Sequence, residues 1–168
     1  MKGKLLINGV ELSVEIPDQD LQKILASQDE KKTGYERVVC GNRYFYDVGH
    51  EDDSTIEENV DIDIAMYDAA NYYSSRDVAK NNTRADRLMR RLRRFAVTHR
   101  GTDNDRVDGN LKFCIVYDHN HNSLVIETAF SNQTHGVVYF DSHGTAVLAV
   151  EEFHDELIWY FTEYKDSL

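Results

Sequence analysis

The segment KFCIVYDHNHNSLVIETAF, Lys112–Phe130, consists of two apolar runs separated by a polar one. KFCIVYD and SLVIETAF are rich in β-branched and aromatic residues, which favour β-strands. The Asp, Asn and His residues of the central DHNHN tolerate the backbone geometry of a tight turn. The segment therefore predicts an antiparallel hairpin.

A strand and a long helix are expected after this hairpin. GVVYF, residues 136–140, predicts the strand, and Ser142 is a typical helix N-cap. Apolar residues at helical spacing predict a helix from about Ser142 to Glu163. Trp159 lies at the edge of the apolar stripe and is either a partly buried core residue or an interface anchor. The stripe consists of Ala146, Val150, Phe153, Leu157, Tyr160, Phe161 and Tyr164.

The preceding part of the chain repeats this order. NRYFYDV, residues 42–48, predicts a strand, and ANYYSS, residues 70–75, ends in serine as VVYFDS does. A second long helix is expected from about Ser75 to His99, with a kink or break at Asn81–Thr83 because Asn and Thr are poor helix formers. The repetition is either a structural duplication or a coincidence. The expected fold class is α+β, with antiparallel hairpins each followed by a helix, and the helices packed on the sheet.

The N-terminal residues predict a smaller unit. In LLINGVELSVEI, residues 5–16, alternating residues flank an Asn-Gly pair, which favours a two-residue hairpin turn. DQDLQKILAS, residues 18–27, predicts a short helix. We therefore expect a hairpin plus short helix in residues 1–30, and a main α+β domain with two long helices in residues 40–168.

The charge of the chain restricts its partners. Its 168 residues carry a formal net charge of -11, which repels nucleic acid and anionic lipid over most of the surface. We find no apolar run typical of a signal peptide or a transmembrane helix. Cys40 and Cys114 form no CxxC pair, which fits a reducing compartment. We expect an intracellular protein that does not bind a membrane.

Motifs for catalysis and cofactor binding are not apparent. The sequence contains no GxSxG, HExxH or glycine-rich phosphate-binding frame, so we expect a protein that is not an enzyme and has no cofactor. His119 and His121, with Asp118, fit either a small metal site or an ordinary hairpin turn. The turn is favoured because further ligands are missing, and we expect no metal.

Positive charge is concentrated in RADRLMRRLRRFAVTHR, residues Arg84–Arg100, which contains seven arginines. Helical spacing places Leu88, Leu92 and Phe95 on the core face. The arginines then fit an anion-binding site or internal pairing with Asp47–Asp68, a run of nine acids without lysine or arginine. Internal pairing is favoured, because the two charge blocks adjoin and the net charge repels an anion. The candidate anion-binding residues are Arg87, Arg90, Arg91, Arg93 and Arg94.

The acidic run has three interpretations. It is a solvated loop, a site for a hard cation, or a surface whose carboxylates stand in for nucleic-acid phosphates on a protein partner. Its spacing matches no calcium-binding loop, which disfavours the second interpretation. For the third, the candidate partner-binding residues are Glu51, Asp52, Asp53, Glu57, Glu58, Asp61 and Asp63.

Several segments together resemble a group of small bacteriophage and prophage proteins. They are VDIDIAMYDAANYYSS with RADRLMRRLRRFA, and KFCIVYD with VVYFDSHGTAVLAVEEFHDELIWYF. The pattern covers about Asn42 to Phe161, and KNNTRAD interrupts its first helix. The resemblance implies a cytoplasmic protein of the bacterial host cell that binds host machinery, as anti-CRISPR inhibitors do.

Together with the acidic run, the resemblance predicts a non-enzymatic phage inhibitor. Its partner would be a host protein, such as a nucleic-acid-binding defence effector and in particular a CRISPR nuclease, held by an acidic surface that mimics DNA. The alternative is a phage accessory protein that binds nucleic acid directly through the arginine-rich helix.

Overall fold

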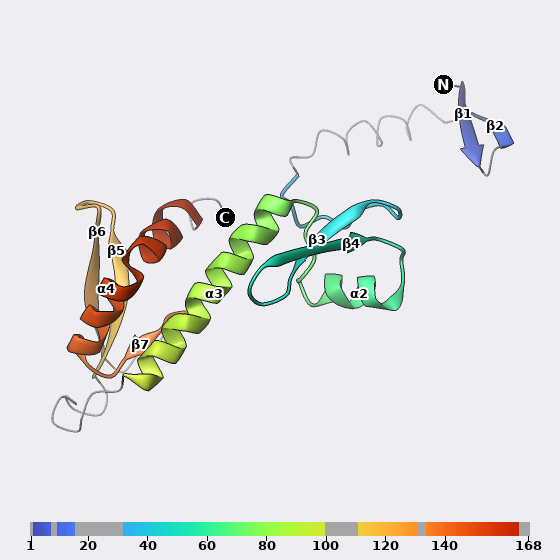
Figure 1. The fold of residues 1–168 in the computed structure, drawn as a ribbon. Coiled ribbons are helices and arrows are strands. Elements are labelled where there is room, and N and C mark those ends of the chain that lie inside the picture. The colour runs from blue at the N-terminus through green and yellow to red at the C-terminus, as the bar shows by residue number, and fades with distance from the viewer. Residues whose placement is uncertain (1, 8–9, 16–31, 100–110, 131–133, 165–168) are drawn as a thin grey trace.

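The computed structural model describes residues 2–7, 10–15, 32–99, 111–130 and 134–164 (Figure 1). The protein belongs to the α+β class, as the sequence predicts, and its strands within these ranges form antiparallel sheets in the orders β1–β2, β3–β4 and β6–β5–β7. The elements are β1 (Lys2–Ile7), β2 (Val10–Glu15), β3 (Arg43–Asp47), β4 (Asp52–Ile56), α2 (Asp61–Asp68), α3 (Arg76–Thr98), β5 (Leu111–Asp118), β6 (Ser123–Phe130), β7 (Tyr139–Phe140), α4 (His143–Trp159) and the π-helical turn η2 (Tyr160–Tyr164).

The N-terminal hairpin is confirmed. β1 and β2 pair in antiparallel register that ends with Ile7 opposite Val10, so two residues connect the strands, as an Asn-Gly turn requires. The turn itself and the short helix expected at residues 18–27 lie outside the described residues. The boundary between a unit of residues 1–30 and a domain of residues 40–168 stays a prediction.

The hairpin expected at Lys112–Phe130 is confirmed as β5 and β6. Its register ends with Asp118 opposite Ser123, so the turn falls in the predicted polar segment. The short strand β7 pairs with the other edge of β5, where Phe140 lies opposite Phe113. β7 is followed directly by α4, and we call β5, β6, β7 and α4 the second unit.

β3 and β4 form a corresponding hairpin that the sequence predicted only in part. β4 and α2 occupy much of the acidic run, which we expected to be a loop connection. The backbone of β4 pairs with β3; of its two acidic side chains, Asp53 is exposed and Asp52 is partly buried and paired with Arg76. At the start of α2, Asp63 accepts hydrogen bonds from the backbone N–H groups of Glu58 and Val60. The negative charge of Asp63 also stabilises the N-terminus of the helix.

The two hairpins belong to units of the same topology. We call β3, β4, α2 and the following segment to Tyr73 the first unit. In the first unit Phe45 of β3 pairs with Tyr73, and in the second β5 pairs with Phe140 of β7. Tyr73 and Phe140 each stand two residues before the N-cap serine of the next helix, which is Ser75 for α3 and Ser142 for α4. The shared pairing and cap position support a structural duplication over a coincidence.

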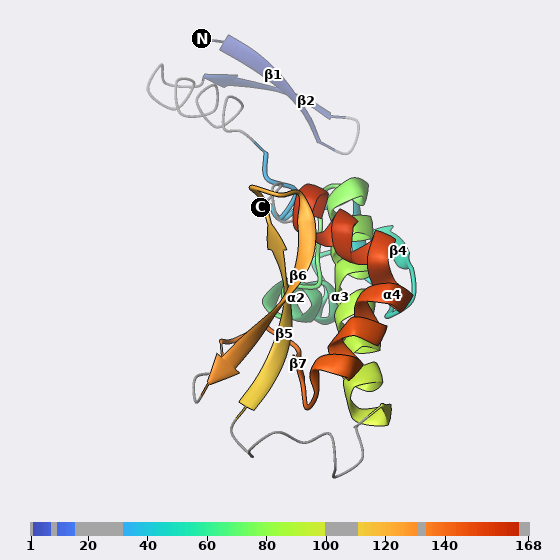
Figure 2. The ribbon, with the colours of Figure 1, turned by 90° about the vertical axis from the view of Figure 1, so that its left-hand side faces the viewer.

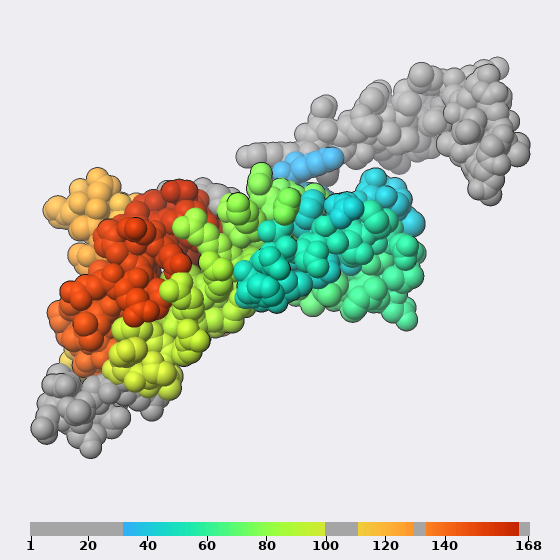
Figure 3. Space-filling model, in the orientation of Figure 1, coloured from blue at the N-terminus to red at the C-terminus, as the bar shows by residue number. Residues whose placement is uncertain are grey.

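α3 lies between the two units and contacts both (Figure 3). Its bounds agree with the predicted helix, but the kink expected at Asn81–Thr83 is wrong, because the helix is continuous there. The Asn82 side chain donates to Tyr35 Oη at 2.8 Å and accepts from Tyr164 Oη at 2.6 Å. These tertiary contacts offset the poor helix propensity of asparagine.

The apolar core lies between α3, α4 and the β6–β5–β7 sheet. Both helices pack on the same face of this sheet (Figure 2). The predicted helix stripes meet here, with Leu88 and Phe95 of α3 against Phe153 and Leu157 of α4. The other buried members are Leu92, Phe113, Ile115, Phe140, Ala146 and Ala149. Packing of the helices on the sheet is therefore confirmed.

Candidate functional site

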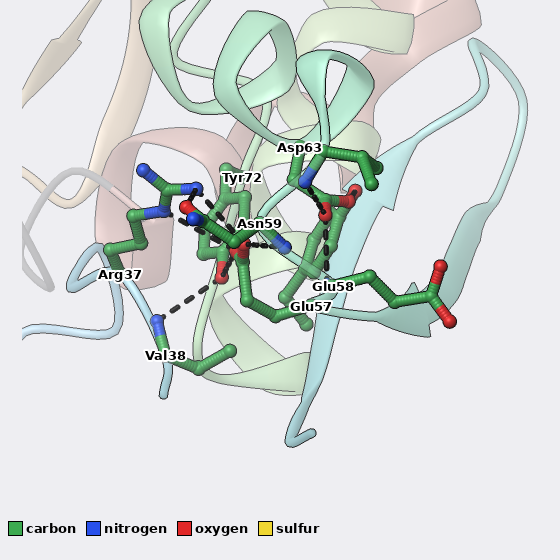
Figure 4. A network of polar contacts seen from close by, with 9 residues as sticks. Arg37, Val38, Glu57, Glu58, Asn59, Asp63 and Tyr72 are labelled. Atoms are coloured by element: carbon green, nitrogen blue, oxygen red, sulfur yellow. Dashed lines mark hydrogen bonds and ion pairs between the residues drawn. The ribbon is translucent and has the colours of Figure 1, made fainter. Parts of the chain in front are cut away.

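Two carboxylates of the acidic run are buried in the first unit (Figure 4). Glu57, which follows β4, is only 2% exposed. It accepts hydrogen bonds from Tyr72 Oη at 2.7 Å, Arg37 Nη2 at 2.9 Å and the Asn59 backbone N–H at 2.9 Å. The Tyr72 hydroxyl accepts from the Val38 backbone N–H at 3.1 Å. The network thus joins the chain before β3 to the end of β4.

Asp63, in the first turn of α2, is the second buried carboxylate and is also 2% exposed. It accepts hydrogen bonds from Tyr44 Oη at 2.9 Å and from the backbone N–H groups of Glu58 at 2.9 Å and Val60 at 3.2 Å. The rings of Tyr44 and Tyr72 stack with centroids 4.0 Å apart, which brings the two carboxylates into one network. Because a buried carboxylate must keep its donors, this network fixes the rotation of α2.

These contacts set the protonation states of the network. The hydrogen bond from Arg37 is the main cause that lowers the pKa of Glu57, and the Glu58 backbone N–H is the main cause that lowers the pKa of Asp63. Desolvation raises the pKa of Tyr72 to about 12. At neutral pH the carboxyls are charged and the phenol is neutral. Both carboxylates are buried and accept hydrogen bonds from groups of the protein itself, so neither is available to a partner.

The other candidate acidic residues lie near the surface of the same unit. Asp52 is partly buried and forms an ion pair with Arg76 at 2.9 Å. Figure 4 shows the Glu58 side chain pointing away from the network. We define the acidic face by the four exposed members of the predicted set, which are Glu51, Asp53, Glu58 and Asp61. Glu57 and Asp63 are excluded from this face by their burial.

Arg91 of α3 forms a partly exposed contact with α4 at the border of the core. Its Nη1 donates to both carboxylate oxygens of Glu156 on α4, each at 2.7 Å. Its guanidinium carbon lies 4.7 Å from the centroid of the Phe153 ring. Arg91 therefore joins the two long helices and is not available as an anion-binding group.

Arg87 and Arg90 hold the β3–β4 turn against α3. Arg90 donates to the Gly49 carbonyl oxygen at 2.6 Å, and Arg87 donates to the His50 carbonyl oxygen at 3.4 Å. Arg90 also lies 3.9 Å from Asp47, the first acid of the run. Both side chains are used for internal contacts, although mainly to backbone groups.

Pairing between α3 and the acidic run is more limited than the sequence suggested. Among the described residues, Arg90 with Asp47 and Arg76 with Asp52 are the ion pairs between them. Arg93 and Arg94 are exposed and have no ion pair in the described part of the chain. Within the described ranges, the four residues of the acidic face form no ion pair with the arginine helix.

A polar groove of about 650 Å³ lies between the β3–β4 turn, α3 and the end of α4. Trp159 lines it and is 8% exposed, with the Arg84 guanidinium carbon 3.7 Å from its ring centroid. This burial supports the core interpretation of Trp159. The charged residues of the lining are Glu51, Asp52, Asp77, Lys80, Arg84, Arg87 and Glu163, so charges of both signs meet any ligand.

The two candidate metal-binding histidines lie at the β5–β6 turn. His121 Nδ1 is 2.5 Å from Asp118 Oδ2, a contact that is the main cause of the lowered pKa of Asp118. Asp118 also accepts from the Asn120 backbone N–H at 2.8 Å, as in an Asx turn, and His119 packs edge-on against Tyr117. Within the described ranges, no group of three or more His, Cys, Asp or Glu residues is arranged to hold a metal ion.

No protein-family model, curated protein or solved structure matches this chain. In the part of the chain that the structure describes, no helix combines the length and the apolar character needed to cross a lipid bilayer. The function is therefore inferred from the residues and their geometry.

The groups that donate hydrogen bonds to Glu57 and Asp63 could not be predicted from the sequence. Arg37, Tyr44 and Tyr72 are distant from these carboxylates along the chain, and no short motif links them. One local signal was present, because an acid three residues after a helix N-cap commonly binds backbone N–H groups there. That signal predicts a helix start at Val60, but not the burial of Asp63.

Proposed function

We propose that this protein is a phage-encoded, non-enzymatic inhibitor that binds a host defence effector, such as a CRISPR nuclease, through its acidic face. The carboxylates take the place of nucleic-acid phosphates on a basic surface of the effector. The observation that carries this proposal is that the four acids of the face are exposed while Arg87, Arg90 and Arg91 of the adjoining helix donate to the His50 and Gly49 carbonyl oxygens and to Glu156 instead of to these acids.

Electrostatics supports a basic partner. Arginine side chains that grip phosphates also grip carboxylates, so an acidic surface can occupy a nucleic-acid site. The formal net charge of -11 accelerates association with such a site and repels nucleic acid itself. The phage origin and the class of partner are supported by the sequence resemblance.

The test is DNA cleavage by a panel of guide-loaded CRISPR nucleases, with and without the protein. The test variant combines Glu51→Lys, Asp53→Lys, Glu58→Lys and Asp61→Lys. The matched control combines Glu127→Lys, Glu151→Lys, Glu152→Lys and Asp155→Lys, the same change in charge at exposed positions of β6 and α4.

We expect the wild type and the control to inhibit at least one nuclease, and the test variant to be inactive while its thermal unfolding temperature is nearly unchanged. Inhibition that survives in the test variant would contradict binding through the acidic face. Uninhibited cleavage by every member of the panel would contradict the choice of CRISPR nucleases as partners.

A second candidate function is direct nucleic-acid binding through α3, which the exposure of Arg93 and Arg94 favours. Contacts from these two arginines to phosphates predict a slope of about -2 for log affinity against log salt concentration. We expect fluorescence titrations with short DNA and RNA to show no complex tighter than micromolar. A nanomolar complex that Arg93→Ala with Arg94→Ala abolishes would favour this second function.

A further inference from the structure

α2 has the reverse of the usual distribution of side chains. In a surface helix, apolar residues pack on the core and acidic residues face solvent. The buried residue of α2 is Asp63, whereas Ile62, Ile64 and Tyr67 are 57%, 40% and 41% exposed. Exposed apolar side chains that lie together on a protein surface typically mark an interaction site.

The buried network produces this orientation. The hydrogen bond from Tyr44 Oη of β3 holds the Asp63 side of α2 against the β3–β4 hairpin, and the two bonds from the Glu58 and Val60 backbone N–H groups hold it to the chain just before α2. Residues three and four apart are neighbours on a helix, so Ile64 and Tyr67 lie on one flank, and Val60 is the N-cap residue one turn before Ile64, whose backbone N–H donates to the Val60 carbonyl oxygen. Val60 is 44% exposed, and Arg37 lies over the Tyr67 ring, 5.9 Å from its centroid. We call Val60, Ile64 and Tyr67 the apolar strip.

Acidic side chains border the apolar strip. Asp61 and Asp68 follow the outer side of α2 beside it, and Glu58 precedes it in the chain. All three are exposed, and none of them has an ion pair among the described residues. Figure 1 places α2 beside the β3–β4 hairpin, on the side of α3 away from α4, where α4 does not cover it. An apolar centre with a polar rim is the usual anatomy of a protein interface, and here the rim is mainly negative, because Arg37 at Tyr67 is paired with Glu57.

We propose that the apolar strip is the centre of the docking surface, and that it takes an apolar ridge flanked by lysine or arginine side chains on a protein partner. The rim excludes a second copy of this chain, because a symmetric dimer would bring like charges together. This proposal rests on the proposed function and defines the partner's surface further. A surface that only imitated the phosphates of nucleic acid would need carboxylates and no apolar centre, so the apolar strip is a separate requirement on the partner.

The test uses two synthetic peptides of equal length and charge. One is an amphipathic helix with leucine on one face and lysine on the other, and in the second peptide serine replaces each leucine. By fluorescence anisotropy, we expect the wild type to bind the leucine peptide about tenfold more tightly than the serine peptide. Val60→Ser with Ile64→Ser should remove this preference and retain weak, salt-dependent binding of both peptides.

The matched control is Val97→Ser with Leu148→Ser, which changes apolar residues of α3 and α4 that are 59% and 51% exposed. We expect the control to keep the preference. Thermal unfolding verifies that both double variants fold, and each replaces side chains at the surface.

Equal affinity of the wild type for the two peptides would overturn the proposal, as would a preference that survives Val60→Ser with Ile64→Ser. Self-association of the wild type that the same substitutions abolish in sedimentation velocity would also overturn it, because the occupant would be a second copy. Failure of the proposed function is seen separately, as nuclease inhibition that persists after charge reversal of the acidic face.

Discussion

The two units share an order of strands and helix, but their interiors have opposite chemistry. The second unit is closed by apolar groups such as Phe140 and Phe153. The first is closed by tyrosines and by the carboxylates of Glu57 and Asp63, and it contains α2 between β4 and Tyr73. Apolar packing depends on shape and area, whereas a buried polar network depends on each donor and acceptor.

This difference assigns separate roles to the two units. The second unit, which we call the apolar unit, supports the packing of α3 and α4. The first unit, which we call the polar unit, holds α2 in one orientation, with the apolar strip and the acidic face at the surface. Buried hydrogen-bonded charges specify an arrangement more than they add stability, a role that we infer for Glu57 and Asp63. Substitutions in the two units should therefore differ in size and in consequence.

Truncation in the apolar unit is expected to have the largest effect. Phe140 is 1% exposed, so Phe140→Ala leaves a cavity and should lower the free energy of unfolding by about 3–5 kcal/mol. Denaturant unfolding measures this loss. Val137→Ala, at a residue that is 37% exposed, should change it by less than about 1 kcal/mol. Similar losses in the two variants would contradict an apolar core at Phe140.

Removal of one hydroxyl from the polar unit should have an intermediate effect. Tyr44→Phe deletes a donor to the charged Asp63, and we expect a loss of about 1.5–3 kcal/mol in the same unfolding experiment. The control is Tyr46→Phe in the same strand, since its hydroxyl donates to the exposed Asp53 at 3.3 Å and should contribute less than about 1 kcal/mol. A loss for Tyr44→Phe no larger than that for Tyr46→Phe would show that the buried bond does not stabilise the unit.

Acid should open the polar unit before the apolar one. The folded-state pKa values of Glu57 and Asp63 are lowered, so their contribution is complete above the unfolded values near pH 4 and is lost as pH falls through the folded values. Glu36, whose pKa is lowered to about 2 chiefly by the Thr33 backbone N–H, adds to this loss between about pH 4 and pH 2. In the described part of the second unit, the carboxyl with a lowered pKa is that of Asp118, which lies at a hairpin turn outside the core.

Amide hydrogen exchange at decreasing pH measures this order. We expect residues 43–73 to lose protection at a higher pH than residues 111–118 and 143–159. Simultaneous loss in both regions would mean that the two interiors do not respond separately to protonation.

The helix caps should show the smallest difference between the units. Ser142 Oγ accepts from the Thr145 backbone N–H at 3.1 Å, so Ser142→Ala should lower stability by about 1 kcal/mol. Ser75 makes no side-chain capping bond, and Ser75→Ala should change stability by less than about 0.5 kcal/mol. Thermal unfolding of the two variants tests this order, and an equal or larger effect at Ser75 would reverse it.

The sequence predicted the apolar unit better than the polar one. The spacing of Phe153 and Leu157 and the cap at Ser142 are local signals, so the position of α4 followed from them. β4 was missed because its acidic residues resemble a loop. The burial of Asp63 depends on Tyr44, which is 19 residues away along the chain, and periodicity carries no information about such a contact.

The candidate site, like the first unit, was predictable from the sequence only in part. Composition identified the acidic run and the arginine helix, but not which acids are buried or which arginines bind backbone carbonyls. Those outcomes depend on how the two units place α2 and α3, as the contacts of Glu57 with Arg37 and of Arg90 with Gly49 illustrate. The exposed apolar strip was not anticipated, because helical spacing alone would place isoleucines inside.

The most direct test of the central claim is hydrogen–deuterium exchange of the protein with and without an effector that it inhibits. The claim is that the polar unit presents the docking surface and that the apolar unit supports it. We predict slower exchange on binding in residues 52–68, which contain β4 and α2, and unchanged exchange in residues 143–159 of α4. Slower exchange confined to residues 84–98 of α3 or to α4, with residues 52–68 unchanged, would contradict the account.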